Sequence, residues 1–294
     1  MFEYIAAHTG LYILLVSALG LIVGSFLNVI VHRLPVMLEK NWHQQCMDYL
    51  NQSTPAEETI TQYNLLYPAS HCPKCYAKLH LWHNIPIISY LLLKGRCAFC
   101  QAPIPLRYFL VEIISMVLSV IAALEFGPSY ELLAVLILTW FLIVISFIDI
   151  EHQILPDVLT IPLLWLGLLF NCWNFFTTTH DAILGAIFGY SFFWVIDKLF
   201  KLITHQEGIG EGDFKLLAAS GAWLGWELLP FIVLCSSLLG LIVGSSVLFA
   251  KKQSRKTPIP YAPFIAITIW VGAIWGFDIT RDYLQLFGIT WANV

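Results

Sequence analysis

Two aspartates, Asp149 and Asp213, each stand at one end of an apolar segment. Asp149 follows the apolar run of residues 139–148, and Asp213 completes the sequence Gly-Glu-Gly-Asp at residues 210–213. An ionisable side chain at the edge of a bilayer is costly and marks a functional site by default. Two carboxylates that meet can share one proton, so that one acts as base and the other as acid in hydrolysis. The pair therefore predicts acid–base chemistry at one membrane face.

Each acid also has a less specific explanation. Asp149 could be a surface acid at the water interface, and the glycines before Asp213 could form a flexible helix entry. These glycines do not suit a dinucleotide-binding loop, because no strand–helix–strand pattern surrounds them. They favour a close backbone approach, which would let an extended peptide lie beside Asp213. Asp157, in the Leu-Pro-Asp sequence after Asp149, is expected to be the N-cap of the next helix.

The composition is that of an integral membrane protein. The chain has 294 residues, of which 59% are hydrophobic and 12% are charged, and its mean hydropathy is +0.76. Soluble globular domains carry about 25% charged residues. The net charge of −4 argues against nucleic acid as a partner, because nucleic-acid binding needs a basic surface. We expect the chain to contact membrane lipid instead.

Eight apolar segments divide the chain, and most approach the ~20 residues that a membrane-spanning helix needs. They cover residues 11–31, 106–126, 132–148, 158–175, 182–200, 214–226, 229–250 and 259–277. We therefore predict an all-α polytopic membrane protein with about eight transmembrane helices. It would consist of a first helix (residues 1–31), a polar domain (residues 32–105) and a helical bundle (residues 106–294) that carries both aspartates. Within the polar domain, residues 36–49 are expected to be helical.

The basic residues predict the orientation in the membrane. With eight spans, all but one of the 15 Lys and Arg residues lie in or beside loops on one side, and Arg281 is the exception. Because loops rich in Lys and Arg stay in the cytoplasm, both termini are expected outside, in the periplasm. The polar domain and the loop that holds Asp149 would then be cytoplasmic.

Two cysteine pairs in the polar domain predict a metal site. The pairs are Cys72 with Cys75 and Cys97 with Cys100, and 21 residues separate them. Two such knuckles can aim four thiolates at one tetrahedral ion, and four thiolates suit structural Zn²⁺. The alternatives are thiols with a redox role or no function, whereas disulfides are rare in the cytoplasm. With all four ligand positions filled by protein, the ion would hold the fold rather than catalyse.

Five motifs occur together in one order along the chain. They are GSFLN at residues 24–28, RLP at 33–35, the two cysteine pairs, Asp149 followed by LPD at 155–157, and GxGD at 210–213. In this combination the chain resembles the bacterial type IV prepilin peptidases, which are bifunctional leader peptidase/N-methyltransferases of type IV pili and type II secretion. The match spans residue 24 to about residue 215, and the combination is specific, although GxGD alone is not.

The resemblance implies an activity and a location. Asp149 and Asp213 would be the catalytic pair of a GxGD-type aspartic endopeptidase in the bacterial inner membrane. The substrates would be prepilins and pseudopilins, cut on the cytoplasmic side after a glycine that ends a short basic leader. The apolar remainder of the prepilin helix would stay in lipid. The enzyme would then methylate the new N-terminal residue with S-adenosylmethionine, for which the sequence assigns no binding residues.

Two other function classes make different predictions. A proton-coupled transporter could use the two acids as a relay, but it predicts carboxylates near the bilayer midplane and often internal repeats, and no convincing repeat is evident. A non-catalytic scaffold that binds a partner through its zinc domain predicts no loss of function when either aspartate becomes asparagine. A mass change in a prepilin exposed to the protein would separate both from the peptidase.

Overall fold

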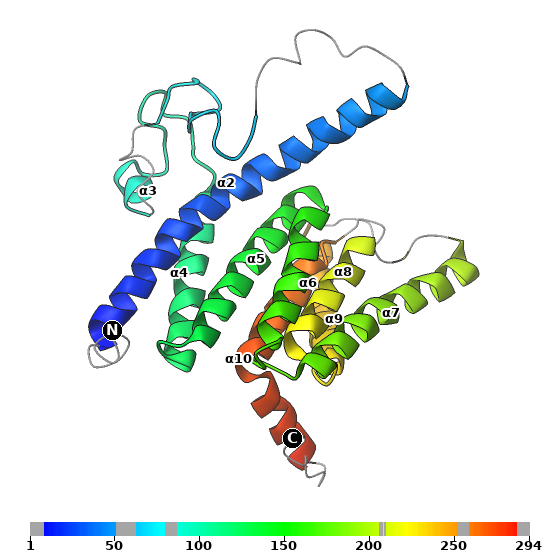
Figure 1. The fold of residues 1–294 in the computed structure, drawn as a ribbon. Helices are drawn as coiled ribbons and strands as arrows, with labels where there is room; N and C mark the ends of the chain where they lie inside the picture. The colour runs from blue at the N-terminus through cyan, green and yellow to red at the C-terminus, as the bar shows by residue number, and fades with distance from the viewer. Residues whose placement is uncertain are drawn as a thin grey trace. The chain divides into compact units, whose positions relative to one another are not determined.

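The described structure is helical and forms two compact units. It is a computed structural model that describes residues 9–50, 63–79, 87–205, 208, 210–251 and 259–286. The units are Met1–Pro128 and Ser129–Val294 (Figure 1). Among the described residues the only β-type pairings are two isolated bridges in the first unit. The predicted all-α fold is confirmed.

The first unit is built on α2 (Thr9–Tyr49) and α4 (Leu106–Phe126), with the short α3 (Ile88–Leu92) between them in the chain. The predicted helix at residues 36–49 is present, but it is the continuation of the first apolar segment rather than a separate element. α2 runs through Pro35 without ending, as the long blue helix of Figure 1 shows. Leu34 and Pro35 are both buried, so tertiary packing outweighs the helix-breaking tendency of proline here.

Small residues join α2 to α4. A Cβ on Gly20 would lie 2.8 Å from the Cα of Met116, and a Cβ on Gly24 would lie 2.9 Å from the Cα of Glu112. The two glycines are four residues apart on one helix face, which is the arrangement that lets membrane helices approach backbone to backbone. Gly24, the first residue of the GSFLN motif, therefore serves close helix packing.

The second unit contains six helices. They are α5 (Tyr130–His152), α6 (Asp157–Asn171), α7 (Thr179–Thr204), α8 (Glu211–Leu224), α9 (Leu229–Lys251) and α10 (Ala262–Leu286). α8 is the central element: it contacts α6, α7 and α10, and most of its residues from Asp213 onward are buried. All eight predicted apolar segments thus correspond to helices. Six of the described helices are long and apolar enough to cross a membrane.

The other two helices, α6 and α8, are too short to cross a bilayer as straight spans. They have 15 and 14 residues, or about 22 Å at 1.5 Å per residue, against a hydrocarbon thickness of about 30 Å. The prediction of about eight spans is therefore approximate. A short helix such as α8 can begin within the bundle, which places its first residues among the other helices.

α7 and α8 pack through backbone contact. A Cβ on Gly185 would lie 2.3 Å from the carbonyl oxygen of Gly221, and a Cβ on Gly189 would lie 2.5 Å from that of Leu217. No side chain fits between the two helices at these points. Small residues of this kind drive helix association in membranes. α8 is consequently held at a fixed position along α7.

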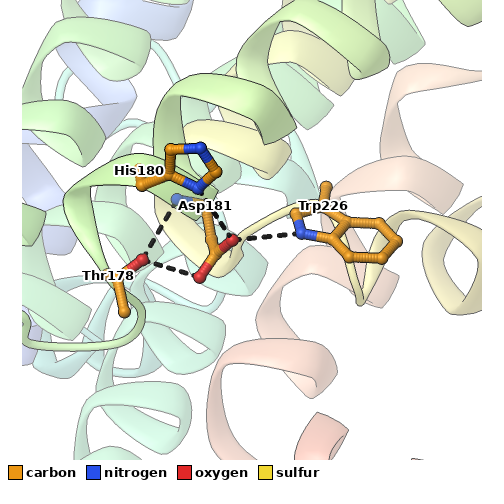
Figure 2. A network of polar contacts seen from close by, with 4 residues as sticks. All are labelled: Thr178, His180, Asp181 and Trp226. Carbon is orange, nitrogen blue, oxygen red and sulfur yellow. Dashed lines mark hydrogen bonds and ion pairs between the residues drawn. The ribbon is translucent and has the colours of Figure 1, made fainter. Parts of the chain in front are cut away.

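A polar network fixes the start of α7 to the end of α8 (Figure 2). Thr178 is the N-cap of α7, and its hydroxyl oxygen accepts the backbone N–H of Asp181 at 3.1 Å. The Asp181 carboxylate accepts the hydroxyl of Thr178 at 2.6 Å and the indole N–H of Trp226 at 3.1 Å. His180 lies 3.5 Å from the same carboxylate. Together with the glycine contacts, this network immobilises the helix that carries Asp213.

Candidate active site and metal centre

Asp149 lies in the last turn of α5 and connects it to the start of α10. The side chain is 3% exposed, and its Oδ2 accepts the backbone N–H of Ala262, the first residue of α10, at 3.0 Å. The first N–H groups of a helix have no partner within the helix and favour a negative charge. The carboxylate is thus held by a segment 113 residues away in sequence.

Asp213 lies in the first turn of α8 and is 8% exposed. Among the described residues, its Oδ1 atom is buried and has no hydrogen-bond partner. The Asp213 and Asp149 carboxylates interact electrostatically, so the second unit brings these two acids near each other. A buried carboxylate oxygen without a partner is rare in folded proteins and has to be explained. A water or a substrate group that hydrogen-bonds to this atom would explain it.

The two glycines of the GxGD sequence have different surroundings. A Cβ on Gly212 would lie 2.5 Å from the Cβ of Leu155, in the connection between α5 and α6. At Gly210, the only atom of the described residues within 4 Å of an added Cβ is Oδ2 of Asp213, at 3.7 Å. Gly212 is therefore required for close packing. Gly210 leaves open space beside the Asp213 carboxylate.

We expect Gly212→Ala to impair the protein far more than Gly210→Ala. The alanine methyl at position 212 must displace Leu155, which follows Asp149 by six residues, so the two acids would be moved apart. Overpacking of this kind costs about 1–3 kcal/mol. Peptidase activity and thermal stability of both variants in one detergent would be compared. If the two variants have the same activity and thermal stability, Leu155 moves aside at little cost in free energy.

The prediction that Asp157 caps α6 is wrong. The N-cap is Pro156, no side-chain cap is formed, and Asp157 is the first residue of the helix. Its Oδ1 instead accepts a hydrogen bond from the Nζ of Lys215 at 2.6 Å. Lys215 follows Asp213 by two residues, so this ion pair links α6 to the first turn of α8. The partner comes from a distant segment, which local sequence cannot reveal.

Asp157→Asn is expected to retain most activity and stability. The Asp157 side chain is 55% exposed, and exposed ion pairs contribute about 0–1 kcal/mol. Cleavage within about twofold of wild type and a small decrease in melting temperature are the expected results. A hundredfold loss of cleavage would instead place Asp157 in the chemistry.

A third buried acid, Asp197, contacts the loop that precedes the GxGD sequence. It lies in α7, is 7% exposed, and its Oδ1 accepts the backbone N–H of Gly208 at 3.1 Å. A Cβ on Gly208 would lie 2.7 Å from the Phe200 ring, so the backbone approaches α7 closely. No motif of the sequence marks this residue. An acid inside a predicted apolar segment was the available signal.

The two cysteine pairs form two knuckles of the same construction in the first unit. In each, the N–H of the first cysteine donates to the carbonyl of the alanine five residues later, Cys72 to Ala77 and Cys97 to Ala102. In each, the residue after the second cysteine has a positive φ, 57° at both Tyr76 and Gln101. The two knuckles share the sequence C-x2-C-x-A and are therefore a short internal repeat. The shared sequence is only six residues long, so it is not evident as a long repeat along the chain.

The four thiols converge as the spacing predicts. All four Sγ atoms lie within 4.8 Å of one another, and those of Cys72 and Cys100 are 3.8 Å apart. A tetrahedral zinc ion with Zn–S bonds of about 2.3 Å requires sulfur–sulfur distances of about 3.8 Å. Backbone hydrogen bonds from Cys75 and Lys74 lower the pKa of Cys72 to about 6, whereas desolvation and hydrogen bonds with the other three thiols raise the pKa of Cys100 to about 11. Without an ion, the cluster thus favours a thiolate at Cys72 and not at Cys100. The sulfur–sulfur distances of the cluster nevertheless fit zinc.

Arg33 of the RLP motif holds the start of the cysteine-containing segment on α2. The Arg33 side chain is 7% exposed. Its guanidinium donates to the carbonyls of Asn64 at 2.9 Å and Pro68 at 2.6 Å. Because the acceptors are backbone atoms in a loop, no residue type in the sequence marks them.

Glu112 has a comparable role within the same unit. It is 9% exposed, and its Oε2 accepts the backbone N–H of Ile87 at 2.8 Å, just before α3. Arg33 and Glu112 thus fasten the knuckle region (residues 72–102) to the two long helices of this unit, Arg33 through the segment that precedes it and Glu112 through the segment between the two knuckles.

Comparisons with known proteins agree with these motifs. Residues 18–126 match the family model described as the bacterial peptidase A24 N-terminal domain, and residues 136–245 match the type IV leader peptidase family. No solved structure matches the chain.

Curated relatives cover nearly the whole chain. A prepilin leader peptidase/N-methyltransferase of Pseudomonas aeruginosa is 47% identical over 98% of this chain and 99% of its own length. Proteins of the same name from Aeromonas hydrophila and Neisseria gonorrhoeae are 47% and 45% identical, over 94% and 87% of this chain and 95% and 88% of their own. The chain therefore belongs to the type IV leader peptidase family and is a membrane peptidase, which confirms the resemblance seen in its motifs.

Proposed function

We propose that this chain cleaves the basic leader of prepilins and pseudopilins with Asp149 and Asp213, at the cytoplasmic face of the bacterial inner membrane. It then methylates the new N-terminal residue with S-adenosylmethionine. The names of the relatives support both activities. The observation that carries the choice of residues is the pair of buried, electrostatically coupled carboxylates, one of which has an oxygen without a partner.

The hydrogen bonds of the pair suggest a division of roles. The N–H of Ala262 stabilises negative charge on Asp149, so Asp149 is the base that takes a proton from the attacking water. Asp213 is the acid that protonates the scissile carbonyl oxygen and later the leaving amine. Two carboxylates that interact electrostatically disfavour the state in which both are ionised. They therefore titrate as one unit rather than as separate groups. Open space beside Gly210 gives the substrate backbone access to Asp213.

The proposed zinc ion is structural. Cys72, Cys75, Cys97 and Cys100 would occupy all four positions of a tetrahedral ion, which leaves none for a substrate or water. The ion would hold the two knuckles together. We assign no residues to the methyl donor, which enters the reaction as a second substrate.

Purified protein is expected to contain about one equivalent of zinc. Cys97→Ser should remove it and loosen the first unit, because metal binding and folding of a small site are coupled. Metal analysis and limited proteolysis of wild type and variant would test this. Cys235→Ser is the matched control, since Cys235 lies in α9 and outside the cluster. Less than half an equivalent in protein purified without chelators would contradict the assignment.

Intact-mass measurement of a prepilin tests the proposed function. The substrate is incubated with the purified protein, with and without S-adenosylmethionine. Cleavage would remove the mass of the leader, and methylation would add about 14 Da (one CH₂) only when the donor is present. An unchanged substrate would contradict both activities and favour the transporter or the scaffold. Cleavage without methylation would contradict the second activity alone.

A further inference from the structure

An apolar groove of about 490 Å³ lies in the second unit. Its lining residues come from α7, α9 and the segment that leads into α10. They include Phe193 and Ile196 of α7, Val233 and Leu241 of α9, and Tyr261 and Phe264. The volume is within the range of about 300–1,000 Å³ that is usual for ligand clefts.

Neighbours of both aspartates connect them to the groove. Tyr261 lines it and directly precedes Ala262, whose N–H is bound by Asp149. Phe193 lines it too, and its ring lies 6.2 Å from that of Tyr261 and 6.4 Å from that of Phe214. Phe214 directly follows Asp213. The groove is therefore linked to Asp149 through Tyr261 and Ala262, and to Asp213 through the ring contact of Phe193 with Phe214.

The chemistry of the lining suits an apolar occupant. Its exposed surface is mainly hydrocarbon, and its hydroxyl groups already have partners: the Tyr261 hydroxyl bonds to Ser236 at 2.9 Å and to Ser237 at 3.3 Å. None of the described residues that line it is charged. A charged or strongly polar ligand would find no partner there and would lose its hydration. Leu241 remains 68% exposed, so the groove offers apolar surface still to be covered.

We propose that this groove holds the apolar helical segment that follows the scissile bond of a prepilin. The inference rests on the proposed function, because it requires that a peptide be cut between the two aspartates and that its chain continue from them along the groove. Its leader is basic and would be unfavourable in the groove. The segment after the cut is apolar and can exchange lipid contacts for Phe193, Leu241 and Phe264. The groove thereby makes cleavage selective for substrates with an apolar helix next to the cut.

The test compares a full-length prepilin with a short peptide that spans the cut but lacks the apolar segment. Gly240 lines the groove, and a Cβ there would contact Phe264 at 3.4 Å and Tyr261 at 3.5 Å, so an alanine-sized group fits. In Gly240→Leu the longer side chain would occupy the groove, and Leu is a better helix former than Gly. We expect the ratio of kcat/KM for prepilin to kcat/KM for the short peptide to fall about tenfold or more.

The matched control is Ile242→Phe. Ile242 is 61% exposed on α9, two residues from Gly240, and does not line the groove. This variant should keep the wild-type ratio. A ratio unchanged in Gly240→Leu, or lowered equally in both variants, would overturn the inference. If wild-type protein cleaves neither substrate, both the proposed function and this inference are wrong.

Photocrosslinking distinguishes the substrate from lipid as the occupant. p-Benzoylphenylalanine is placed at position 241 in an Asp149→Asn background, so that bound prepilin stays uncut. The expected result is a covalent adduct with the apolar segment of prepilin, absent when the probe is at position 242. Adducts with lipid only, in the presence of saturating prepilin, would overturn the inference while leaving the cleavage activity of the wild type intact.

Discussion

Asp149→Asn and Asp213→Asn are each expected to reduce prepilin cleavage by at least about 10³-fold. Asparagine keeps the size of the side chain but can neither take the proton of the attacking water nor donate one to the leaving amine. The double variant should be little worse than either single variant, because residues that act as one unit are not additive. Intact-mass assays with purified variants in detergent would measure this, together with thermal stability to show that the bundle still forms.

Two other aspartates of the second unit serve as controls for this experiment. Asp181→Asn alters the network at the opposite end of α7 and α8 from Asp213. Asp157→Asn alters an exposed ion pair. Both should cleave at rates near wild type, although Asp181→Asn is expected to lower stability, because asparagine has one acceptor oxygen in place of two and loss of a hydrogen bond typically costs about 1 kcal/mol. Near-normal cleavage by either dyad variant would exclude the assignment of Asp149 and Asp213.

The pattern of apolar residues predicted which segments are helical better than it predicted the residues at which the helices begin and end. Each of the eight segments contains a described helix because long apolar runs leave a chain little alternative in a bilayer. The ends were missed where packing overrides local tendency, as at Pro35, where α2 continues, and at α6, which ends at Asn171. Asn171 donates to the carbonyls of Ala222 and Trp223 on α8, and hydropathy carries no information about such a contact.

The candidate site was predictable to the extent that its groups are marked by residue type. Cysteine spacing located the cluster of four thiols, and acids beside apolar runs indicated Asp149 and Asp213. The contacts of Arg33, Glu112 and Asp197 were not predicted, because each side chain binds a backbone group of a distant or irregular segment. Every residue carries such backbone groups, so their position depends on the fold and not on a motif.

Gly95→Val is expected to yield cleaved but poorly methylated prepilin. Gly95 has φ +67°, and a Cβ there would lie 2.9 Å from the Tyr90 hydroxyl oxygen. Its N–H donates to Tyr90 and its carbonyl accepts from Ile104, so the residue joins α3 to the second knuckle. A β-branched residue at positive φ costs about 1–3 kcal/mol and would shift this part of the first unit. The measured quantity is the ratio of methylated to unmethylated product.

Gly127→Val provides a control with the same backbone strain at a different place. Gly127 has φ +59° at the end of α4, and nothing described lies within 4 Å of its missing Cβ. It should therefore methylate normally in proportion to cleavage. Zinc analysis of both variants would show whether any loss at Gly95 follows from loss of the metal.

Separate effects are expected because the groups concerned lie in different units. Gly95 and the four cysteines belong to Met1–Pro128, whereas both aspartates belong to Ser129–Val294. Methylation needs a bound polar donor and a free amine, and neither requires the acid–base pair. Asp149→Asn and Asp213→Asn should consequently still methylate a precleaved peptide. If Gly95→Val methylates that peptide as well as wild type does, the donor site does not depend on the knuckle region and must be sought in the helical bundle.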